Sequence, residues 1–336
     1  MDLNRDFVRR YWFLAALILL IPVGIIAPQA GLTLKESGWV IPVFVGIMLG
    51  IAGFTMDTSS LVKQATNFQA VIPVLLSIYL FSPALAFGLG VWFAPAGNEH
   101  FLPAMMIMAA QAGSLASAIA LTMMAGGNRE LALICTLASN SLTFLLTPFI
   151  LEISIGADVD FRVGEMMLRM VYMVLLPIAA GQLLRPLLWE RTEPIRPFIR
   201  IVPQFIILMF VYTGFASGAQ QLQGAPNIVL RFLAACAILH LALLAWNYLL
   251  SGWLRFDWPD RTAMMLNGSQ KTLPNGIYVW SNFFATNPYG AVPLVLYHLF
   301  QLLVDTLLVP WFEKRNPACG KHDGKQTFAC HASEES

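Results

Sequence analysis

Charged side chains are scarce in this chain. Asp, Glu, Lys and Arg make up 12% of its 336 residues, whereas hydrophobic residues make up 57% and the mean hydropathy is +0.67. Because a soluble domain carries about 25% charged residues, this chain has too few polar side chains to cover a globular surface. The scarcity predicts an integral membrane protein. The net charge of +1, without a dense basic cluster, also argues against a nucleic-acid partner.

Several signatures of metal sites and enzymes are also missing. The four cysteines are scattered, two in apolar segments and two in the C-terminal tail, so no disulfide framework is implied. The cysteines and histidines of the tail do not have zinc-finger spacing. The apolar segments contain no HExxH, paired-aspartate or Ser/His/Asp arrangement. We therefore expect no metal, no cofactor and no enzymatic activity.

Long apolar segments dominate the sequence. Reading about 20 mostly apolar residues as one spanning helix, we predict ten transmembrane helices, at residues 11–27, 38–56, 71–94, 101–124, 130–153, 165–188, 199–218, 226–253, 261–283 and 290–312. Arg9 and Arg10 before the first segment could also belong to a signal peptide. That segment is long enough to span and nothing soluble follows it, so we interpret it as a membrane helix. The predicted fold class is an all-α polytopic membrane protein.

The basic residues divide between two sets of connecting segments. One set contains Arg5, Arg9, Arg10, Lys63, Arg129, Arg185, Arg191, Arg196, Arg200, Arg255, Lys314 and Arg315, and the opposite set contains Lys35, Arg162 and little else that is basic. With ten helices the first set lies wholly on one side of the membrane. By the positive-inside rule, both termini are then cytoplasmic.

The chain contains a weak internal repeat. Pro22 and Pro177 lie in similar apolar sequences 155 positions apart, and Gly113 and Gly268, each followed by serine, are also 155 positions apart. Because each half contains five predicted helices, the second half enters the membrane in the opposite orientation. Inverted repeats with interrupted helices at matching positions are typical of secondary transporters.

The fourth and ninth segments are interrupted by polar and small residues. The ninth contains Asn267-Gly268-Ser269-Gln270-Lys271-Thr272-Leu273-Pro274-Asn275, and the fourth contains Gln111-Ala112-Gly113-Ser114-Leu115-Ala116-Ser117. In lipid a broken helix survives only where protein or a water-lined cavity satisfies its backbone, and its ends can bind a ligand. Close packing through small residues is the alternative, but Lys271 and Pro274 disfavour it for the ninth segment.

Further polar residues recur at helical spacing. They include Thr136, Asn140 and neighbouring hydroxyls in the fifth segment and His298, Gln301 and Asp305 in the tenth. Asp305 costs roughly 2.5–3.5 kcal/mol at bilayer depth on insertion scales. It therefore either faces the protein as the partner of Lys271 or reaches the membrane surface. We interpret His240 and Asn247 in the eighth segment as interhelical hydrogen-bonding groups.

These features resemble the bile acid:sodium symporter superfamily, of the solute-carrier family 10 type. The similarity extends over residues 5–315, and its motifs are Gly53-Phe54-Thr55-Met56, Leu146-Thr147-Pro148, Leu176 to Pro186, Gly268 to Leu273, and Tyr297-His298 with Gln301. The last two are similar to the subgroup of the orphan seventh human member and its bacterial relatives. The resemblance implies one ten-helix transporter unit over residues 1–315, with a panel of helices 1, 2, 6 and 7 and a core of helices 3–5 and 8–10. The polar residues 316–336 are expected to form a disordered cytoplasmic tail.

The resemblance also implies sodium ligands, and here the chain departs from the pattern. Three residues fall on liganding positions of sodium-coupled members: Ser117, Thr136 and Gln270. The acidic residue expected before the ninth-segment motif is replaced by Leu266 or Asn267, and an asparagine of the fourth segment is replaced by Ala118. Lys271 stands where those members have a neutral amide. Because an ammonium supplies the charge of a bound sodium ion, we expect the site to repel Na⁺ and attract anions.

The sequence therefore predicts a secondary transporter that moves a small organic anion across the bacterial cytoplasmic (inner) membrane by alternating access. The residues expected to bind substrate are Gln111, Gly113, Ser114, Asn140, Gly268, Ser269, Gln270, Lys271, Asn275 and His298. Those expected to bind a coupling ion or form a charge pair are Ser117, Thr136, Lys271, Gln301 and Asp305. The expected partners are the lipid bilayer, the anionic solute and either Na⁺ or H⁺.

Two alternative functions stay open at this point: a sodium-coupled bile-acid-like symporter and a non-transporting membrane regulator on the same scaffold. The choice of substrate, coupling ion, transport direction and oligomeric state is open as well. Arsenite efflux is disfavoured because the thiol expected in the fourth segment is absent.

Overall fold

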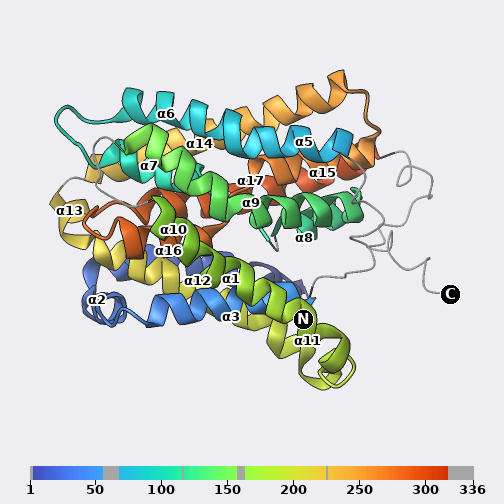
Figure 1. Ribbon diagram of the computed structural model, residues 1–336, viewed down its shortest axis with the longest axis horizontal. Coiled ribbons are helices and arrows are strands. Elements are labelled where there is room, and N and C mark those ends of the chain that lie inside the picture. The colour runs from blue at the N-terminus through green and yellow to red at the C-terminus, as the bar shows by residue number, and fades with distance from the viewer. Residues whose placement is uncertain (1–2, 56–67, 116, 157–162, 225, 317–336) are drawn as a thin grey trace.

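The computed structural model describes residues 3–55, 68–115, 117–156, 163–224 and 226–316, and these residues form helices and no strand. Most of the helices run along one common direction, and their connecting segments gather at two ends (Figure 1). Among the described residues, six helices are long and apolar enough to cross a membrane: Phe68–Phe93, Arg129–Ile155, Val163–Leu188, Glu193–Ser217, Pro226–Trp253 and Val292–Arg315. All six coincide with predicted segments.

Two of these long helices contain a π-helical turn. The first consists of α5 (Phe68–Leu76), η1 (Ser77–Phe81) and α6 (Ser82–Phe93), and the other of α10 (Val163–Met170), η2 (Val171–Leu175) and α11 (Leu176–Leu188). In each, a proline (Pro83 or Pro177) is the second residue after the π turn. A proline ring clashes with the carbonyl four residues earlier, and the wider π turn relieves that clash.

The remaining long helices are α9 (Arg129–Ile155), α12 (Arg196–Ser217) preceded by the short η3 (Glu193–Ile195), α14 (Pro226–Trp253) and α17 (Val292–Arg315). The short helix α13 (Ala219–Gly224) connects α12 to α14. The predicted tail lies outside the described residues, apart from Asn316.

Four predicted segments are shorter or broken. The end of α1 (Leu3–Ile26) and α2 (Gln29–Glu36) meet at 88°, and α3 (Val40–Thr55) has 16 residues. The fourth segment is divided into α7 (Phe101–Ala109) and α8 (Ser117–Met124), and the ninth into α15 (Trp258–Ser269) and α16 (Leu273–Phe283). By length and composition the described chain has six spans, or seven with the bent pair, so the predicted count of ten is not confirmed. The two predicted breaks are present.

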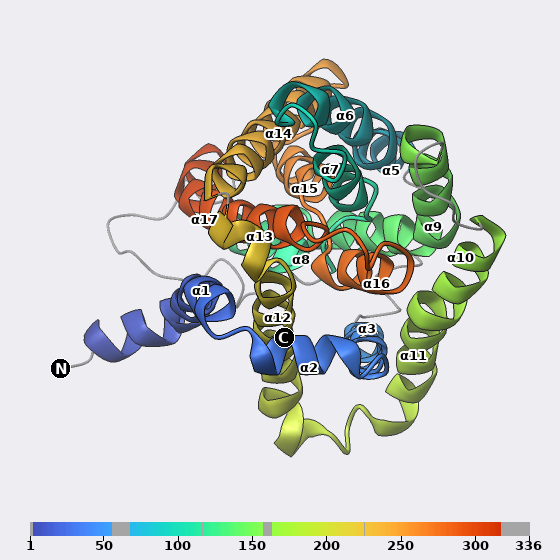
Figure 2. The same ribbon diagram turned by 90° about the vertical axis from the view of Figure 1, so that its left-hand side faces the viewer.

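The helices form two layers. Seen from one end (Figure 2), α1, α3, α11 and α12 lie together beside a thicker bundle made of α5–α9 and α14–α17. Within the thinner layer α3 and α11 approach so closely that a Cβ on Gly53 or on Gly181 would overlap the backbone of the other helix. From the bundle, α16 contacts both α3 and α12. The bundle contains both broken helices and therefore the predicted site.

Candidate functional site

The two breaks face each other inside the bundle. The backbone N–H of Thr272, between α15 and α16, donates a hydrogen bond to the carbonyl of Ala112, between α7 and α8 (2.9 Å). A Cβ on Gly113 would lie only 3.3 Å from the carbonyl oxygen of Asn267. Pro274 lies in the first turn of α16, where its missing N–H costs nothing. Two segments remote in the sequence thus form one crossing region.

Side chains from α9 and α17 satisfy the carbonyl groups that the breaks expose. Asn140 and Thr147 of α9 donate to the carbonyls of Gly113 (3.0 Å) and Ala110 (2.6 Å), and Tyr297 and Gln301 of α17 donate to those of Ser269 (2.6 Å) and Lys271 (3.0 Å). The Gln301 amide oxygen also accepts from the backbone N–H of Lys271 (2.8 Å). Unpaired backbone groups in a bilayer cost several kcal/mol each, so these side chains keep the interruptions stable.

Lys271 is at the centre of the crossing region. Its side chain is 2% exposed, and its Nζ donates to the carbonyls of Gln111 (3.0 Å) and Ile78 (2.7 Å). Ile78 belongs to the π turn η1, an irregularity that occurs frequently at functional sites. An ammonium group has three N–H donors and no acceptor, so one donor is left for a further ligand when the group is charged.

A chain of hydrogen bonds connects the two breaks to α17 and α14. Ser114 and Ser117 share a hydrogen bond (2.6 Å), Ser117 donates to the Gln270 oxygen (2.7 Å), and the Gln270 amide donates to Asp305 Oδ2 (2.6 Å). The other carboxylate oxygen of Asp305 lies 2.9 Å from His240 Nε2. Asp305 is therefore bonded on both oxygens and is fully buried.

The residues at the three positions that the resemblance assigns to sodium ligands form hydrogen bonds to other protein groups. Thr136 Oγ1 donates to the Asn267 oxygen (2.8 Å), while Ser117 and Gln270 bond to each other. Asn267 thus occupies the place next to Thr136, where its amide provides no negative charge. The set can hold a neutral hydrogen-bond network, but it lacks the anionic ligand that the resemblance would require.

Three buried polar atoms of the crossing region have no hydrogen-bond partner within the described part of the chain: Gln111 Oε1, Asn275 Oδ1 and His298 Nε2. Gln111 and Asn275 each donate through their amide nitrogen, to Ile107 (2.7 Å) and to Asn140 (3.4 Å), so their oxygens remain as acceptors. His298 Nδ1 lies 3.1 Å from the Gln301 amide nitrogen. Buried unpaired polar atoms are rare in native structures and call for an explanation.

A sequence profile of the SBF-like CPA transporter family matches residues 11–314. The chain belongs to this family. An uncharacterized protein of Pseudomonas aeruginosa is 28% identical over 316 residues, which are 90% of this chain and 93% of that protein. YfeH of Escherichia coli, a candidate symporter, is 25% identical over 283 residues (81% and 83%), and mouse sodium/bile acid cotransporter 7 is 22% identical over 313 residues (90% and 92%). The protein is thus an integral membrane protein of a transporter family, and the resemblance found in the motifs is confirmed.

The pair between Lys271 and Asp305, one of the two alternatives for Asp305, is not formed among the described residues. Lys271 bonds to two carbonyls and Asp305 bonds to His240 and Gln270. His240 was interpreted only as an interhelical group, because a lone histidine in an apolar segment carries no signal of its partner. Asn247 of α14 is the other residue interpreted as an interhelical hydrogen-bonding group, and its amide lies directly against Gly268.

Proposed function

We propose that this protein is a secondary active transporter that moves a small organic anion across the bacterial cytoplasmic membrane by alternating access, without a requirement for Na⁺. The observation that carries the proposal is the place of Lys271, a buried lysine between two interrupted helices. Secondary transporters bind their substrates at such interruptions, and an ionisable residue at this depth marks a substrate or ion path. The family membership supports transport as the activity.

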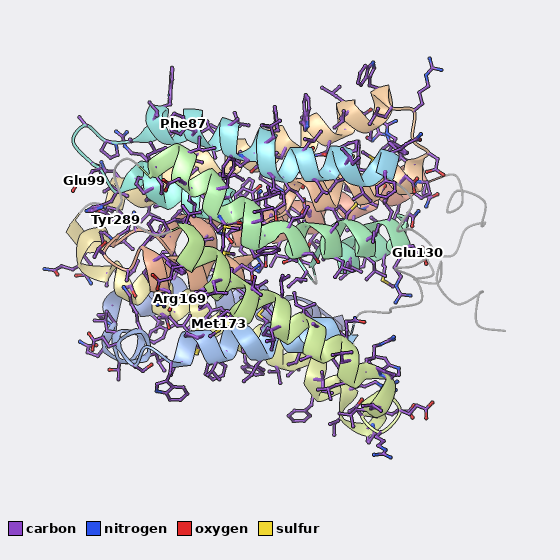
Figure 3. All side chains as sticks on the ribbon, in the orientation of Figure 1. Phe87, Glu99, Glu130, Arg169, Met173 and Tyr289 are labelled. Carbon is purple, nitrogen blue, oxygen red and sulfur yellow. The ribbon has the colours of Figure 1, made fainter. Side chains whose placement is uncertain are left out.

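The proposal includes ten crossings: the six long helices and the four shorter or broken segments. In support, residues 27–39, 94–100 and 284–291 lie at one end of the bundle, and residues 125–128, 189–195 and 254–257 lie at the other (Figure 1). Glu99 and Tyr289 are at the first end and Glu130 is at the second (Figure 3). Reporter fusions after Arg191 and Lys314 should read cytoplasmic, and one after Asn98 should read external.

The inverted repeat is part of the same proposal. After α8, Asn128 donates through its side chain to Asp260 at the start of α15 (2.7 Å). After α16, Asn287 donates through its side chain to the carbonyl of His100, just before α7 (2.9 Å). The end of each broken helix is thus hydrogen-bonded to the start of the other, as is expected if a two-fold axis relates the two halves of the chain. Alternating access would then be a movement of the core (α5–α9, α14–α17) against the panel (α1–α3, α10–α12).

The unpaired atoms suggest the chemistry of the solute. Lys271 offers positive charge, while the free oxygens of Gln111 and Asn275 accept hydrogen bonds and so favour hydroxyl groups on the ligand. A hydroxylated carboxylate satisfies both. The hydroxyls of Ser117 and Thr136 are already bonded within the protein, which supports transport without bound Na⁺.

The test is uptake of labelled carboxylates by proteoliposomes that contain the purified protein. Gluconate and lactate should enter faster than acetate and propionate, and replacing Na⁺ by K⁺ should leave the rates unchanged. Lys271→Met should abolish uptake, whereas the matched change at an exposed lysine, Lys314→Met, should not. Saturable uptake that requires Na⁺ would favour the sodium-coupled alternative. A folded protein that transports none of these probes, nor taurocholate, would favour a regulator.

A further inference from the structure

His240 of α14 and Asp305 of α17 form a buried pair beside the crossing region. His240 Nε2 lies 2.9 Å from Asp305 Oδ1, and both side chains are 0% exposed. The rings of Tyr297 and Phe300 stand nearly perpendicular to the imidazole, with centroids 5.5 and 6.0 Å away. A carboxylate enclosed in this way is costly unless it is paired and hydrogen-bonded. Neither side chain of the pair bonds to Lys271, whose Nζ donates to the carbonyls of Ile78 and Gln111.

Both ring nitrogens of His240 face hydrogen-bond acceptors. Nε2 faces Asp305 Oδ1, and Nδ1 faces the carbonyl oxygen of Ser269 at 3.4 Å. A neutral imidazole carries only one N–H, whereas an imidazolium carries two. In the neutral form, with the proton on Nε2, the Nδ1 lone pair therefore points toward a carbonyl oxygen. The protonated form has an N–H for each acceptor, and the Ser269 carbonyl, which already accepts from Tyr297, can accept a second hydrogen bond.

Apart from Asp305, the other ionisable groups on the elements packed against α14 bond to groups other than the His240 ring in the described structure. On α14 the adjacent turn carries Cys236, which donates to the carbonyl of Pro293 (3.7 Å). From α17 the ring is faced by Asp305 and Tyr297, while His298 bonds to Gln301. Ionisable residues of the other packed elements are engaged elsewhere: Tyr79 of η1 with Ser139, Asp260 and Arg261 of α15 with Asn128 and Tyr248, and Lys271 with Ile78 and Gln111. The helices α6 and α13 contain no ionisable residue.

With Lys271 and Asp305 both charged, the buried region is neutral when His240 is neutral and no anion is bound. Among the described residues, the buried lysine and carboxylate are Lys271 and Asp305, and the buried histidines are His240 and His298. When Lys271 is an ammonium and Asp305 is a carboxylate, their charges cancel. A monovalent anion at Lys271 leaves one uncompensated negative charge, which is unfavourable at low dielectric. One proton on His240 restores neutrality.

We propose that the His240–Asp305 pair is a proton site, and that His240 binds one proton for each monovalent organic anion that the protein carries. The proton comes from a hydronium ion on the side where the anion enters: one of its O–H bonds breaks as an N–H bond forms at His240 Nδ1. On the other side this N–H bond breaks, and a water molecule accepts the proton. The cycle is then electroneutral proton–anion symport. The proton site stands on the geometry of the pair, and the coupling to an anion rests on the proposed function.

Proton binding at His240 and anion binding at Lys271 are coupled through the segment between α15 and α16. Ser269, whose carbonyl faces Nδ1, is the last residue of α15. Gln270 and Lys271 follow it directly, and Gln270 bonds to Asp305. An N–H at Nδ1 attracts the Ser269 carbonyl, so the proton acts on the segment that carries Lys271. Anion binding at Lys271 in turn favours the protonated ring, since such coupling between two sites is reciprocal.

The proton site is tested without any substrate. The ring carbons of histidine are labelled with ¹³C, and the purified protein is titrated by NMR. We expect one signal, absent from His240→Gln but present in the control His100→Gln, to change from neutral imidazole to imidazolium as the pH falls from about 8 to 5. In Asp305→Asn this signal should remain neutral. A His240 signal that stays in one protonation state throughout that range overturns the proton site.

The coupling is tested in proteoliposomes with gluconate and lactate as probes. A gradient of two pH units, alkaline inside, should drive up to about 100-fold accumulation, because each pH unit is a tenfold ratio of proton activity. Clamping the membrane potential should not change the rate. His240→Gln should lose this accumulation, whereas the control His100→Gln should keep it.

The outcomes of the two experiments separate the proton site from the proposed function. A titrating His240 without flux of any probe would refute the transport function and leave the proton site standing. Flux that ignores the pH gradient would refute the coupling and leave transport standing. A rate that follows the membrane potential would refute the one-to-one stoichiometry.

Discussion

The side-chain amide of Asn247 lies so close to Gly268 that a Cβ at position 268 would overlap it. Asn247 also accepts a hydrogen bond from Ser77 Oγ (2.9 Å), and Ser77 in turn accepts from the indole N–H of Trp246 (3.1 Å). The glycine that precedes the ninth-segment break thus allows α14 and α15 to approach each other around a buried polar contact. Its role in the structure is packing next to the site.

Gly268→Ala should therefore destabilise the protein, because the added methyl group pushes Asn247 away from Ser77. Overpacking of this kind costs about 1–3 kcal/mol. The matched control is Gly88→Ala in α6, where a Cβ would meet nothing within 4 Å, and where alanine favours the helix by up to about 1 kcal/mol. Thermal unfolding in detergent should show a lower Tm for the first variant and an unchanged or higher Tm for the second. Equal melting temperatures would contradict the packing role.

Asn140→Leu tests the support of the fourth-segment break. The change removes the donor that binds the carbonyl of Gly113 (3.0 Å) and leaves that carbonyl buried without this partner, at a cost of about 1–3 kcal/mol. On the same helix, Ser154→Ala removes only bonds to the helix's own carbonyls of Ile150 and Leu151. Urea or thermal unfolding should show a larger loss of stability for Asn140→Leu than for Ser154→Ala. A loss no larger in Asn140→Leu than in Ser154→Ala would mean that α9 does not support the break.

The breaks and the grouping of polar residues around them could be predicted from the sequence, because a lysine and a proline inside an apolar segment disfavour a continuous, lipid-exposed helix. The repeat places the two breaks at matching positions of the two halves, and the structure shows that they meet, since Thr272 bonds to Ala112. The count of ten spans rested on hydropathy, which does not show how a segment such as α3, with 16 residues, lies in the membrane.

The partners of the buried charges could not be predicted. Ile78 contributes a backbone carbonyl, and its availability to Lys271 depends on a π turn that local apolar sequence does not signal. The pairing of His240 with Asp305 depends on how α14 and α17 are turned toward each other. Helical spacing shows which residues share a face of one helix, but it does not show which face of another helix they meet.

Sodium ions should not stabilise the purified protein. Lys271 Nζ already donates to the carbonyls of Ile78 and Gln111, which are groups that suit a cation, and the side chain that accepts from Thr136 Oγ1 is the neutral amide of Asn267. Since a ligand that binds the folded state raises its apparent stability, the Tm should be the same in NaCl, KCl and choline chloride at equal ionic strength. A saturable increase in Tm with Na⁺ alone would show that hydroxyl, amide and carbonyl oxygens are sufficient for a sodium site.

Lys271→Met should abolish transport and leave a folded, membrane-inserted protein. The change keeps most of the side chain's length but removes its charge, which relieves the cost of burying an ammonium group as well as losing its contacts. Losing a buried charged contact costs about 2–5 kcal/mol, so affinity for a transported carboxylate should fall by roughly 30-fold to several thousand-fold.

The charge balance of the buried region makes a sharper comparison possible. In Lys271→Met only a proton on His240 can balance the charge of Asp305, whereas in Lys271→Met/Asp305→Asn both charges are removed. The double variant should therefore melt at a higher temperature than the single one but transport equally little, since neither attracts an anion. Lys271→Arg should not restore full activity, because a planar guanidinium cannot reproduce the compact contacts at 2.7 and 3.0 Å. Initial rates of uptake, together with the Tm of each variant, measure both effects. Near-normal uptake by Lys271→Met would exclude this lysine as the anion site, whatever the stability of the double variant.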